Sequence, residues 1–516
     1  MSSHVTKFSR IFCAQPYLLK GHIVTVETDV AKGLHKFSII GLPDKAIEEA
    51  RDRVGSALRN SGQSSPKHSQ EKTVVSLAPA ELKKEGSYFD LAIALGYLLA
   101  KGELLIDERL QQTALFIAEL SLNGELRGIK GMLPLAQIAK EKGFTTLYVS
   151  PDDAKEASLV EGMRIVAVPT LSQLINHFNT EDSFSLSLYK SEPSDVSQIK
   201  KHTTCISHIK GQEAAKRGLE IAAAGGHNIA LFGPPGTGKT MLAKAFAGIL
   251  PSLSNEEKLE ITGIHSIAGT LNETLLEQPP FYAPHHTASY VSIIGGGAHI
   301  KPGAVTLSHR GVLFLDEFPE FDKRVIETLR QPLENGNVSI SRAKGTAHFP
   351  ANFILFAAMN PCPCGYYNTG VKNCTCSAHD LSRYQRKLSG PIVDRIDLWI
   401  PVNQISYEKL EEASSDGENS ETVRERITKA RTIQNRRFNS SKTNSDMNAK
   451  DIETYIQLSK ETNTLLKTSA EKLKLSPRAY HRILKLARTI ADLHQSDSIE
   501  SSHILEALSY RPTMFT

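Results

Sequence analysis

One short stretch combines glycines, a lysine and a threonine in a spacing suited to holding phosphate groups. Its residues are Gly233, Pro234, Pro235, Gly236, Thr237, Gly238, Lys239 and Thr240. The glycines let backbone N–H groups turn inward around phosphate oxygens, and a following helix adds the positive end of its dipole. Lys239 can then reach the outer phosphates, and the Thr240 hydroxyl can face a magnesium ion. We therefore expect this P-loop to bind ATP together with Mg²⁺.

An ordinary glycine turn before a helix could show the same letters, so the flanking residues matter. Residues 228–232 form a short apolar run typical of a strand, and residues 241–250 are rich in Ala and Leu, as in a helix. Strand, loop and helix in this order are the context that a P-loop requires. This context favours nucleotide binding over a plain turn.

Two acidic residues and one amide follow apolar strands downstream of the P-loop. Asp316 and Glu317 end the apolar run 311–315, and Asn360 ends the run 353–359. The carboxyl ends of buried parallel strands face the ligand crevice, so Asp316 can hold the magnesium shell and Glu317 can polarise the attacking water. Asn360 can position that water, as the first sensor does in AAA+ ATPases. The alternatives are an acidic pair capping a strand and a turn-forming asparagine before a proline.

Two arginines are candidates for contacts with phosphate. Arg395 lies in the segment 389–397, which resembles the segment carrying the arginine finger of ring ATPases, where it stabilises charge at a neighbour's nucleotide. Its alternative is an ion pair with Asp394 or Asp397. Arg478 follows Ser476 and Pro477 at an expected helix start, where the dipole disfavours a cation. That position fits a second sensor, and a solvated side chain is the alternative.

Four of the six cysteines fall close together. Cys362 and Cys364 form one C-x-C pair, and Cys374 and Cys376 form another after nine intervening residues. Four thiolates from two close pairs can surround a tetrahedral zinc ion, although C-x-x-C is the usual spacing. We expect a structural zinc site, with free thiols or a redox role as alternatives.

Residues 338–348 alternate as a hairpin, with Arg342 and Lys344 near its tip. A basic hairpin before the first sensor is similar to the pore elements of helicase-type AAA+ rings. Basic tips in a central channel would contact DNA phosphates regardless of sequence. A solvated turn is the alternative.

Length and composition set wider limits. A chain of 516 residues is expected to hold more than one domain. The net charge of +4 permits a polyanionic partner without requiring one. No apolar run approaches the roughly 18–20 residues of a membrane span, and the apolar segment 11–14 is too short for a signal peptide. We expect a cytoplasmic protein without a membrane partner.

The order of patterns predicts an α/β protein with a helical end. Residues 1–180 read as a mixed α/β domain, 181–204 as a polar linker, 205–405 as the P-loop α/β core with an insert, and 406–516 as an all-helical lid.

The first domain resembles the catalytic domain of Lon-type proteases, which has a ribosomal protein S5-like fold. The resemblance rests on residues 41–44, 116–124 and 128–131. Tyr88 stands where those enzymes carry the nucleophilic serine, Ser87 is one position away, and Lys130 matches the partner lysine. A lysine without a nucleophile cannot run that reaction, so we expect a structural or partner-binding domain without the catalytic serine.

Together these motifs resemble the magnesium-chelatase-like AAA+ family, and within it the YifB/ComM group. The match spans nearly the whole chain and includes residues 41–44, 211–217, the P-loop, 283–289, 360–365 and 475–480. The resemblance implies a homo-hexameric ATPase that encircles single-stranded or branched DNA. It further implies branch migration or helicase action in natural transformation and homologous recombination, with recombination proteins as partners. The rival template is a magnesium-chelatase-type chaperone that remodels a protein partner.

Overall fold

The computed structural model describes residues 7–34, 36–66, 70–179, 186–189, 204–297, 300–342, 345–370, 372–405 and 417–512. Its contacts divide the chain into two compact units. The first contains Met1–Ser197 with Lys258–Leu276, and the second contains Gln198–Glu257 with Glu277–Thr516. The expected linker, 181–204, lies largely outside the described residues.

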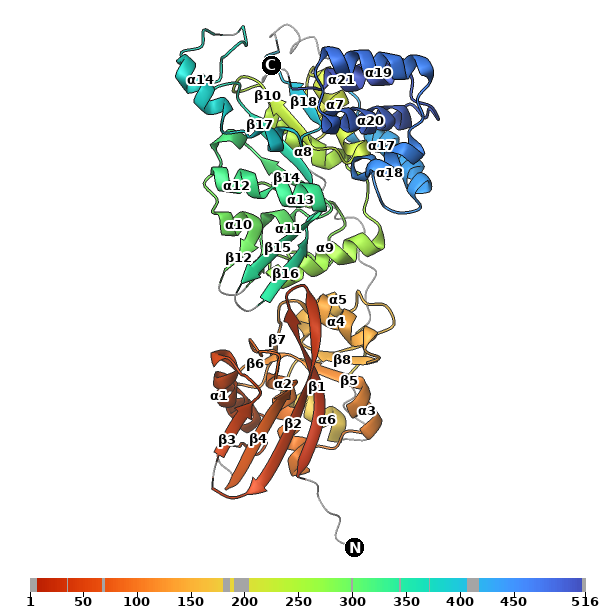
Figure 1. Ribbon diagram of the computed structural model, residues 1–516. Helices are drawn as coiled ribbons and strands as arrows, with labels where there is room; N and C mark the ends of the chain where they lie inside the picture. Colours follow the sequence, from red (N-terminus) through yellow and green to blue (C-terminus); the bar gives the residue numbers. More distant parts are fainter. Residues whose placement is uncertain are drawn as a thin grey trace. The chain divides into compact units, whose positions relative to one another are not determined.

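The first unit is built on one mixed sheet of order β3-β4-β2-β1-β5-β8-β9 (Figure 1). The long strands β1 and β2 pair in antiparallel register from Phe8↔Asp29 to Tyr17↔Lys20. Strand β1 also pairs in parallel with β5, so it joins its antiparallel partner β2 to the parallel strands β5, β8 and β9. The strands are β1 Phe8–Tyr17, β2 Lys20–Lys32, β3 Lys36–Ile40, β4 Glu71–Ala78, β5 Ala114–Ile117, β8 Thr146–Val149 and β9 Arg164–Ala167.

The two longest helices of the first unit differ in how they are buried. Helix α1 (Lys45–Asn60) begins at Asp44, whose side chain accepts a hydrogen bond from the Ile47 amide, and it buries one apolar face. Helix α2 (Asp90–Lys101) is buried along nearly its whole length. The others are α3 Glu108–Thr113, α4 Met132–Glu141, α5 Pro151–Ala157 and α6 Leu171–Asn179, and a short hairpin joins β6 Glu119–Leu120 to β7 Leu126–Arg127.

Ser87 and Lys130, the residues closest to a Lon-type Ser–Lys dyad, contact different groups. Ser87 Oγ donates a hydrogen bond to the Glu119 carboxylate. Lys130 Nζ lies beside Gly269, 2.7 Å from where a Cβ on that residue would be. A serine is activated only by a base within hydrogen-bond reach, so these contacts do not form a Ser–Lys pair.

The second unit contains a five-stranded parallel sheet of order β11-β14-β17-β10-β18. Its strands are β10 Ile229–Phe232, β11 Phe281–Tyr282, β14 Val312–Leu315, β17 Ile354–Met359 and β18 Leu398–Pro401. Every residue of β14 and β17 is buried, as expected for parallel strands covered on both faces. Because all five strands run the same way, the loops after them share one edge of the sheet.

Helices cover this sheet, and two small hairpins project from the second unit. Strands β12 (Gly295–Gly296) and β13 (Lys301–Pro302) form one hairpin, and β15 (Asn337–Arg342) and β16 (Gly345–Pro350) form the basic hairpin expected from the sequence. The helices are α7 Glu213–Gly225, α8 Lys239–Ile249, α10 Tyr290–Ile294, α11 Ala304–Leu307, α12 Lys323–Thr328, α13 Arg330–Asn335, α14 Ala378–Gln385 and α15 Gly390–Val393, while α9 Asn255–Ala268 crosses from the second unit into the first.

The C-terminal helices form the expected lid beside α7 and α8 (Figure 1). They are α17 Ser420–Phe438, α18 Ala449–Tyr455, α19 Lys460–Lys472, α20 Pro477–Leu493 and α21 Ser501–Ser509. Arginines of α17 dock the lid on the core instead of remaining solvated: Arg426 Nε donates to Glu220 at 2.6 Å, and Arg431 Nη2 donates to the Ala223 carbonyl at 2.9 Å. No described helix is both long and apolar enough to cross a bilayer.

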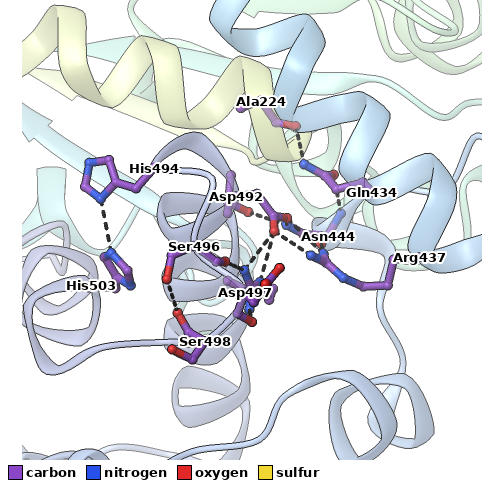
Figure 2. Close-up of polar contacts among 12 residues, drawn as sticks. Ala224, Gln434, Arg437, Asn444, Asp492, His494, Ser496, Asp497, Ser498 and His503 are labelled. Atoms are coloured by element: carbon purple, nitrogen blue, oxygen red, sulfur yellow. Dashed lines mark hydrogen bonds and ion pairs between the residues drawn. The ribbon is translucent and has the colours of Figure 1, made fainter.

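A buried network of hydrogen bonds and ion pairs around Asp492 connects helices of the lid (Figure 2). Arg437 Nη1 and Asn444 Nδ2 donate to Asp492 Oδ2 at 2.9 and 2.8 Å. Gln434 Nε2 donates to the Ala224 carbonyl at the end of α7, and Gln434 Oε1 accepts from the Asn444 amide, each at 3.0 Å. Because the buried carboxylate is paired and hydrogen-bonded, it does not leave an uncompensated charge in the interior.

Candidate nucleotide-hydrolysis site

The P-loop connects β10 to α8 with two glycines in the left-handed region. Gly236 has φ 77° and Gly238 has φ 85°, a conformation that costs other residues free energy. A Cβ on Gly233 would lie 2.0 Å from the Val402 carbonyl oxygen, so only glycine fits there. The loop therefore depends on its glycines for shape as well as for access by phosphate.

Lys239 is buried and folded back onto its own loop. Its Nζ donates to the carbonyls of Gly233 and Pro234, both at 2.8 Å, and to Asn360 Oδ1 at 3.2 Å. Burial lowers the pKa of Lys239 below its usual value, against the opposing effect of Asp316. Lys239 is therefore held by acceptors of the P-loop and of Asn360.

Thr240 and Asp316 meet as the motif predicts. Thr240 Oγ1 donates to Asp316 Oδ2 at 2.8 Å. A hydroxyl and a carboxylate at this spacing are the oxygen ligands that Mg²⁺ takes in P-loop enzymes. The structure thus brings together Lys239, Thr240, Asp316 and Asn360 at the carboxyl edge of the sheet.

Glu317 has a partner that the sequence did not indicate. Its backbone is in the left-handed region with φ 52°, and Oε2 lies 3.1 Å from His286 Nδ1. No local pattern in the sequence pairs His286 with Glu317. A histidine can pair with a carboxylate, but His286 and Glu317 are distant in sequence. They come together because His286 follows β11 and Glu317 follows β14, and these two strands pair.

Arg395 and Arg478 converge on one carboxylate, Glu334, at the end of α13. Arg395 Nη2 donates to Glu334 Oε2, and Arg478 Nη2 donates to Glu334 Oε1 at 2.6 Å. The hydrogen bond from Arg395 lowers the pKa of Glu334, and the positive charges of Arg395 and Arg478 add to this effect. A cavity of about 700 Å³ borders all three residues. No local pattern in the sequence marks Glu334.

This arginine pair lies at the opposite edge of the sheet from the P-loop. The Arg395 carbonyl accepts from Asn228 Nδ2 at 2.9 Å, and Asn228 precedes β10, whereas the P-loop follows β10. A strand rises about 3.3 Å per residue, so the two edges are separated by roughly 13–16 Å. Neither arginine is placed beside Lys239 of its own chain.

The four cysteines come together without a disulfide. The Sγ of Cys362 lies 3.3 Å from that of Cys364 and 3.8 Å from that of Cys374, and Cys364 and Cys374 are 3.5 Å apart at Sγ. All four ligand atoms lie within 4.8 Å of one another. Backbone amides of Thr375 and Tyr366 lower the pKa of the Cys364 thiol to about 5.

This cysteine cluster touches the P-loop. A Cβ on Gly365 would lie 2.7 Å from Pro235 Cδ and 3.9 Å from Asn360 Cγ. Tyr384 Oη also donates to the Asn360 carbonyl at 3.1 Å. The cluster is therefore packed against the loop and the amide that surround the nucleotide position.

Of the two residues expected to contact DNA, only Arg342 is among the described residues. Arg342 ends β15 and pairs in register with Gly345 across the hairpin. Lys344 lies outside the described residues.

A five-stranded parallel sheet with a P-loop, an acidic pair, a polar residue on the neighbouring strand and a helical lid defines a P-loop ATPase of the AAA+ class. Three family models match the chain: "Magnesium chelatase, subunit ChlI" at residues 205–410, "Subunit ChlI of Mg-chelatase" at 26–153, and "Magnesium chelatase, subunit ChlI C-terminal" at 417–511. The chain belongs to the magnesium-chelatase-like AAA+ family, in its YifB/ComM group.

Relatives resemble the chain over almost its whole length. Competence protein ComM of Haemophilus influenzae is 44% identical over 490 residues, which cover 95% of this chain and 94% of that protein. YifB of Escherichia coli is 42% identical with the same coverage. The magnesium-chelatase 38 kDa subunit of Cereibacter sphaeroides is 24% identical over 173 residues, or 30% of this chain and 52% of that subunit.

Proposed function

We propose that this protein is an ATP-hydrolysing ring motor that acts on DNA. One observation supports a ring-shaped assembly. The proposed nucleotide-binding residues and the two arginines that contact Glu334 lie at opposite edges of one parallel sheet. Copies arranged head to tail bring the arginine edge of one to the P-loop edge of the next. Such heterologous contacts close into rings, and we propose a hexamer.

In this scheme each residue has one task. Lys239 and the P-loop amides would hold the phosphates, and Thr240 with Asp316 would hold Mg²⁺, which would supply positive charge beside the phosphate oxygens. Glu317 accepts the proton of the attacking water, and Asn360 orients that water from the adjacent strand. The neighbour's Arg395 and Arg478 stabilise the transition-state charge.

DNA is the proposed substrate on two grounds. Arg342 ends β15, and Lys344 follows it two positions later in the sequence; both are cations suited to phosphate contacts that do not read sequence. The name of the relative ComM is that of a competence protein. We propose that the motor works in the cytoplasm on single-stranded or branched DNA, as in branch migration during transformation and recombination, together with recombination proteins.

The decisive test is the ATPase rate with and without branched or single-stranded DNA, measured across a salt series. We expect stimulation that declines with salt, and no activity in Lys239→Ala. The double variant Arg342→Ala/Lys344→Ala should lose stimulation and keep basal hydrolysis. An ATPase indifferent to DNA but stimulated by a protein partner would instead assign the remodelling role that the name magnesium chelatase suggests.

The cysteine cluster also has a proposed ligand, one structural Zn²⁺. With Zn–S bonds of about 2.3 Å, a tetrahedral site places sulfurs about 3.8 Å apart. The closest Sγ separations, 3.3 to 3.8 Å, approach this spacing. Amides of Cys364 and Tyr367 donate to Cys376 and Cys362 Sγ at 3.4 and 3.3 Å, which would stabilise thiolate ligands.

A further inference from the structure

One stripe of helix α20 faces the segment that carries Arg395. Its members are three or four positions apart, so they share a helix face: Arg478, Arg482, Lys485, Thr489 and Asp492. Arg478 at the start of this stripe contacts Glu334, and Asp492 at its end is the centre of the lid network in Figure 2. The stripe therefore runs from the arginine pair to the buried interior of the lid.

Arg482 contacts both sides of Arg395 in sequence. Its Nη1 donates to the Ile396 carbonyl at 2.8 Å, and its Nη2 donates to Asp394 Oδ1 at 3.2 Å. The Arg482 side chain is only 20% exposed, so the ion pair is partly shielded from water. Two bonds to the residues flanking Arg395 restrict the backbone from which its guanidinium extends.

The same segment is held from the sheet by Asn228. Asn228 Nδ2 donates to the Arg395 carbonyl at 2.9 Å, and its Oδ1 accepts from the Leu355 amide of β17 at 2.8 Å. The Asn228 amide donates to Asp397 Oδ2 at 3.1 Å. One asparagine thus connects the Arg395 segment to the strand that ends at Asn360.

His227 links this anchor back to α20. It is 1% exposed, with Nε2 2.8 Å from Thr489 Oγ1 and Nδ1 3.4 Å from Asp397 Oδ2. Asn444 Nδ2 donates to the same Thr489 hydroxyl at 3.1 Å, and also to Asp492. A Cβ on Gly225 would lie 2.3 Å from the His227 ring, so the contact requires glycine there.

We propose that Arg482 and His227 are positioning residues for Arg395, so that α20 presents Arg395 and Arg478 together to a neighbour's nucleotide. The proposal rests on the inter-subunit site described above. If the connection is rigid, the orientation of the lid fixes the positions of both arginines together. A displacement of about 1 Å in a catalytic group can lower the rate on the order of 100-fold. Lid position would thereby set whether the adjacent subunit hydrolyses its nucleotide.

The test compares steady-state hydrolysis by full-length variants. Arg482→Ala should lower kcat on the order of 10- to 100-fold and leave KM within about twofold, because the affected residue completes another chain's transition state. Arg482→Lys should recover part of kcat, since an ammonium can still donate to Ile396 or Asp394. Arg10→Ala is the matched control: it removes an exposed ion pair with Glu27 between β1 and β2 of the first unit, and it should keep the wild-type kcat.

Mixing separates positioning from a general structural defect. Arg482→Ala has an intact P-loop, and Lys239→Ala has intact arginines, so their mixture should exceed the summed activity of the separate variants. Two results would overturn the positioning role alone. One is absence of recovery in this mixture while a mixture of Arg395→Ala with Lys239→Ala recovers, and the other is a wild-type kcat in Arg482→Ala while Arg395→Ala is defective. A wild-type kcat in Arg395→Ala would overturn both this role and the proposed inter-subunit site. If Arg482→Ala fails to fold, Arg482→Lys replaces it in the test. A kcat below wild type that recovers on mixing with Lys239→Ala supports the proposal, and a wild-type kcat counts against it.

Discussion

His286 holds the carboxylate of Glu317 across two neighbouring strands. The His286 Nδ1 to Glu317 Oε2 distance is 3.1 Å, and the side chains are 31% and 53% exposed. The ring of His285 packs on that of His286 at a centroid distance of 4.2 Å, and His285 Nδ1 lies 2.9 Å from Thr287 Oγ1. If Glu317 is the proposed base, we expect this contact to compete with its approach to an attacking water.

Removing this contact should raise basal hydrolysis. An exposed pair of this kind is worth roughly 0.2–1 kcal/mol, so His286→Ala should increase the DNA-free ATPase rate by at most about fivefold. His285→Ala is the control, because the ion pair with Glu317 is made by the neighbouring residue, His286. A phosphate-release assay measures the change, and a slower His286→Ala enzyme would show that the contact assists catalysis instead.

Binding and hydrolysis should separate at two residues of the site. Glu317→Gln keeps the P-loop intact and removes the base, so nucleotide binding should persist while kcat falls about 100-fold or more. Lys239→Ala should lose binding itself, since the lysine contacts phosphate. Fluorescent-nucleotide titration beside the ATPase assay distinguishes these effects. Undiminished hydrolysis in Glu317→Gln would assign the base to another residue.

Activity should be shared between chains through Arg395. Arg395→Ala should lower kcat about 1,000-fold with little change in nucleotide affinity, because in the proposed ring the guanidinium acts on another chain's transition state. Mixing it with Lys239→Ala should restore activity in rings that place an intact P-loop beside an intact Arg395. The ATPase rate of the mixture provides the measurement, and a strictly additive result would argue for an active site within one chain.

The cysteine cluster should contain about one zinc ion per chain, measured by mass spectrometry of the purified protein. Cys374→Ser should lose this metal, and Cys205→Ser, a cysteine outside the cluster, should retain it. Because Gly365 packs on Pro235, metal loss should also weaken nucleotide binding. Full metal content in Cys374→Ser would exclude that thiol as a ligand.

Asp153 should make the first unit less stable as pH rises. Burial raises its pKa to about 7, although hydrogen bonds from Ser150 and the Ile129 amide oppose the shift. The unfolded pKa is about 3.9, so this contribution to stability is complete below pH 4 and is lost as pH rises through 7. Three pKa units correspond to at most about 4 kcal/mol.

Replacing Asp153 with asparagine removes the ionisation and keeps one oxygen acceptor. Calorimetry of the full chain at pH 5.5 and 8.5 should therefore show a smaller fall in unfolding temperature for Asp153→Asn than for the unchanged protein. Equal pH slopes in the two proteins would mean that Asp153 is not protonated in the folded state.

Elements with a strong local pattern were predictable. Residues 36–40 and 146–149 are rich in β-branched and aromatic side chains, and they form β3 and β8. Apolar residues recur at helical spacing up to residue 60, and this segment forms α1. Strand β1 was missed: only the apolar residues 11–14 were noticed, although Phe8–Tyr17 runs through the middle of the first sheet. Its sequence mixes Ser9, Arg10 and Gln15 with apolar residues, and only pairing with β2 on one side and β5 on the other defines it.

The sequence by itself determined the P-loop, the acidic pair, Asn360 and the two close cysteine pairs, because each depends on residues adjacent along one strand or loop. Tertiary structure decided which distant groups meet: Glu334 with Arg478, 144 positions apart, His286 with Glu317, and Arg482 around Arg395. Such contacts follow from strand order and helix packing. No short-range periodicity encodes them, so the edge of the sheet on which each arginine lies could be read only from the fold.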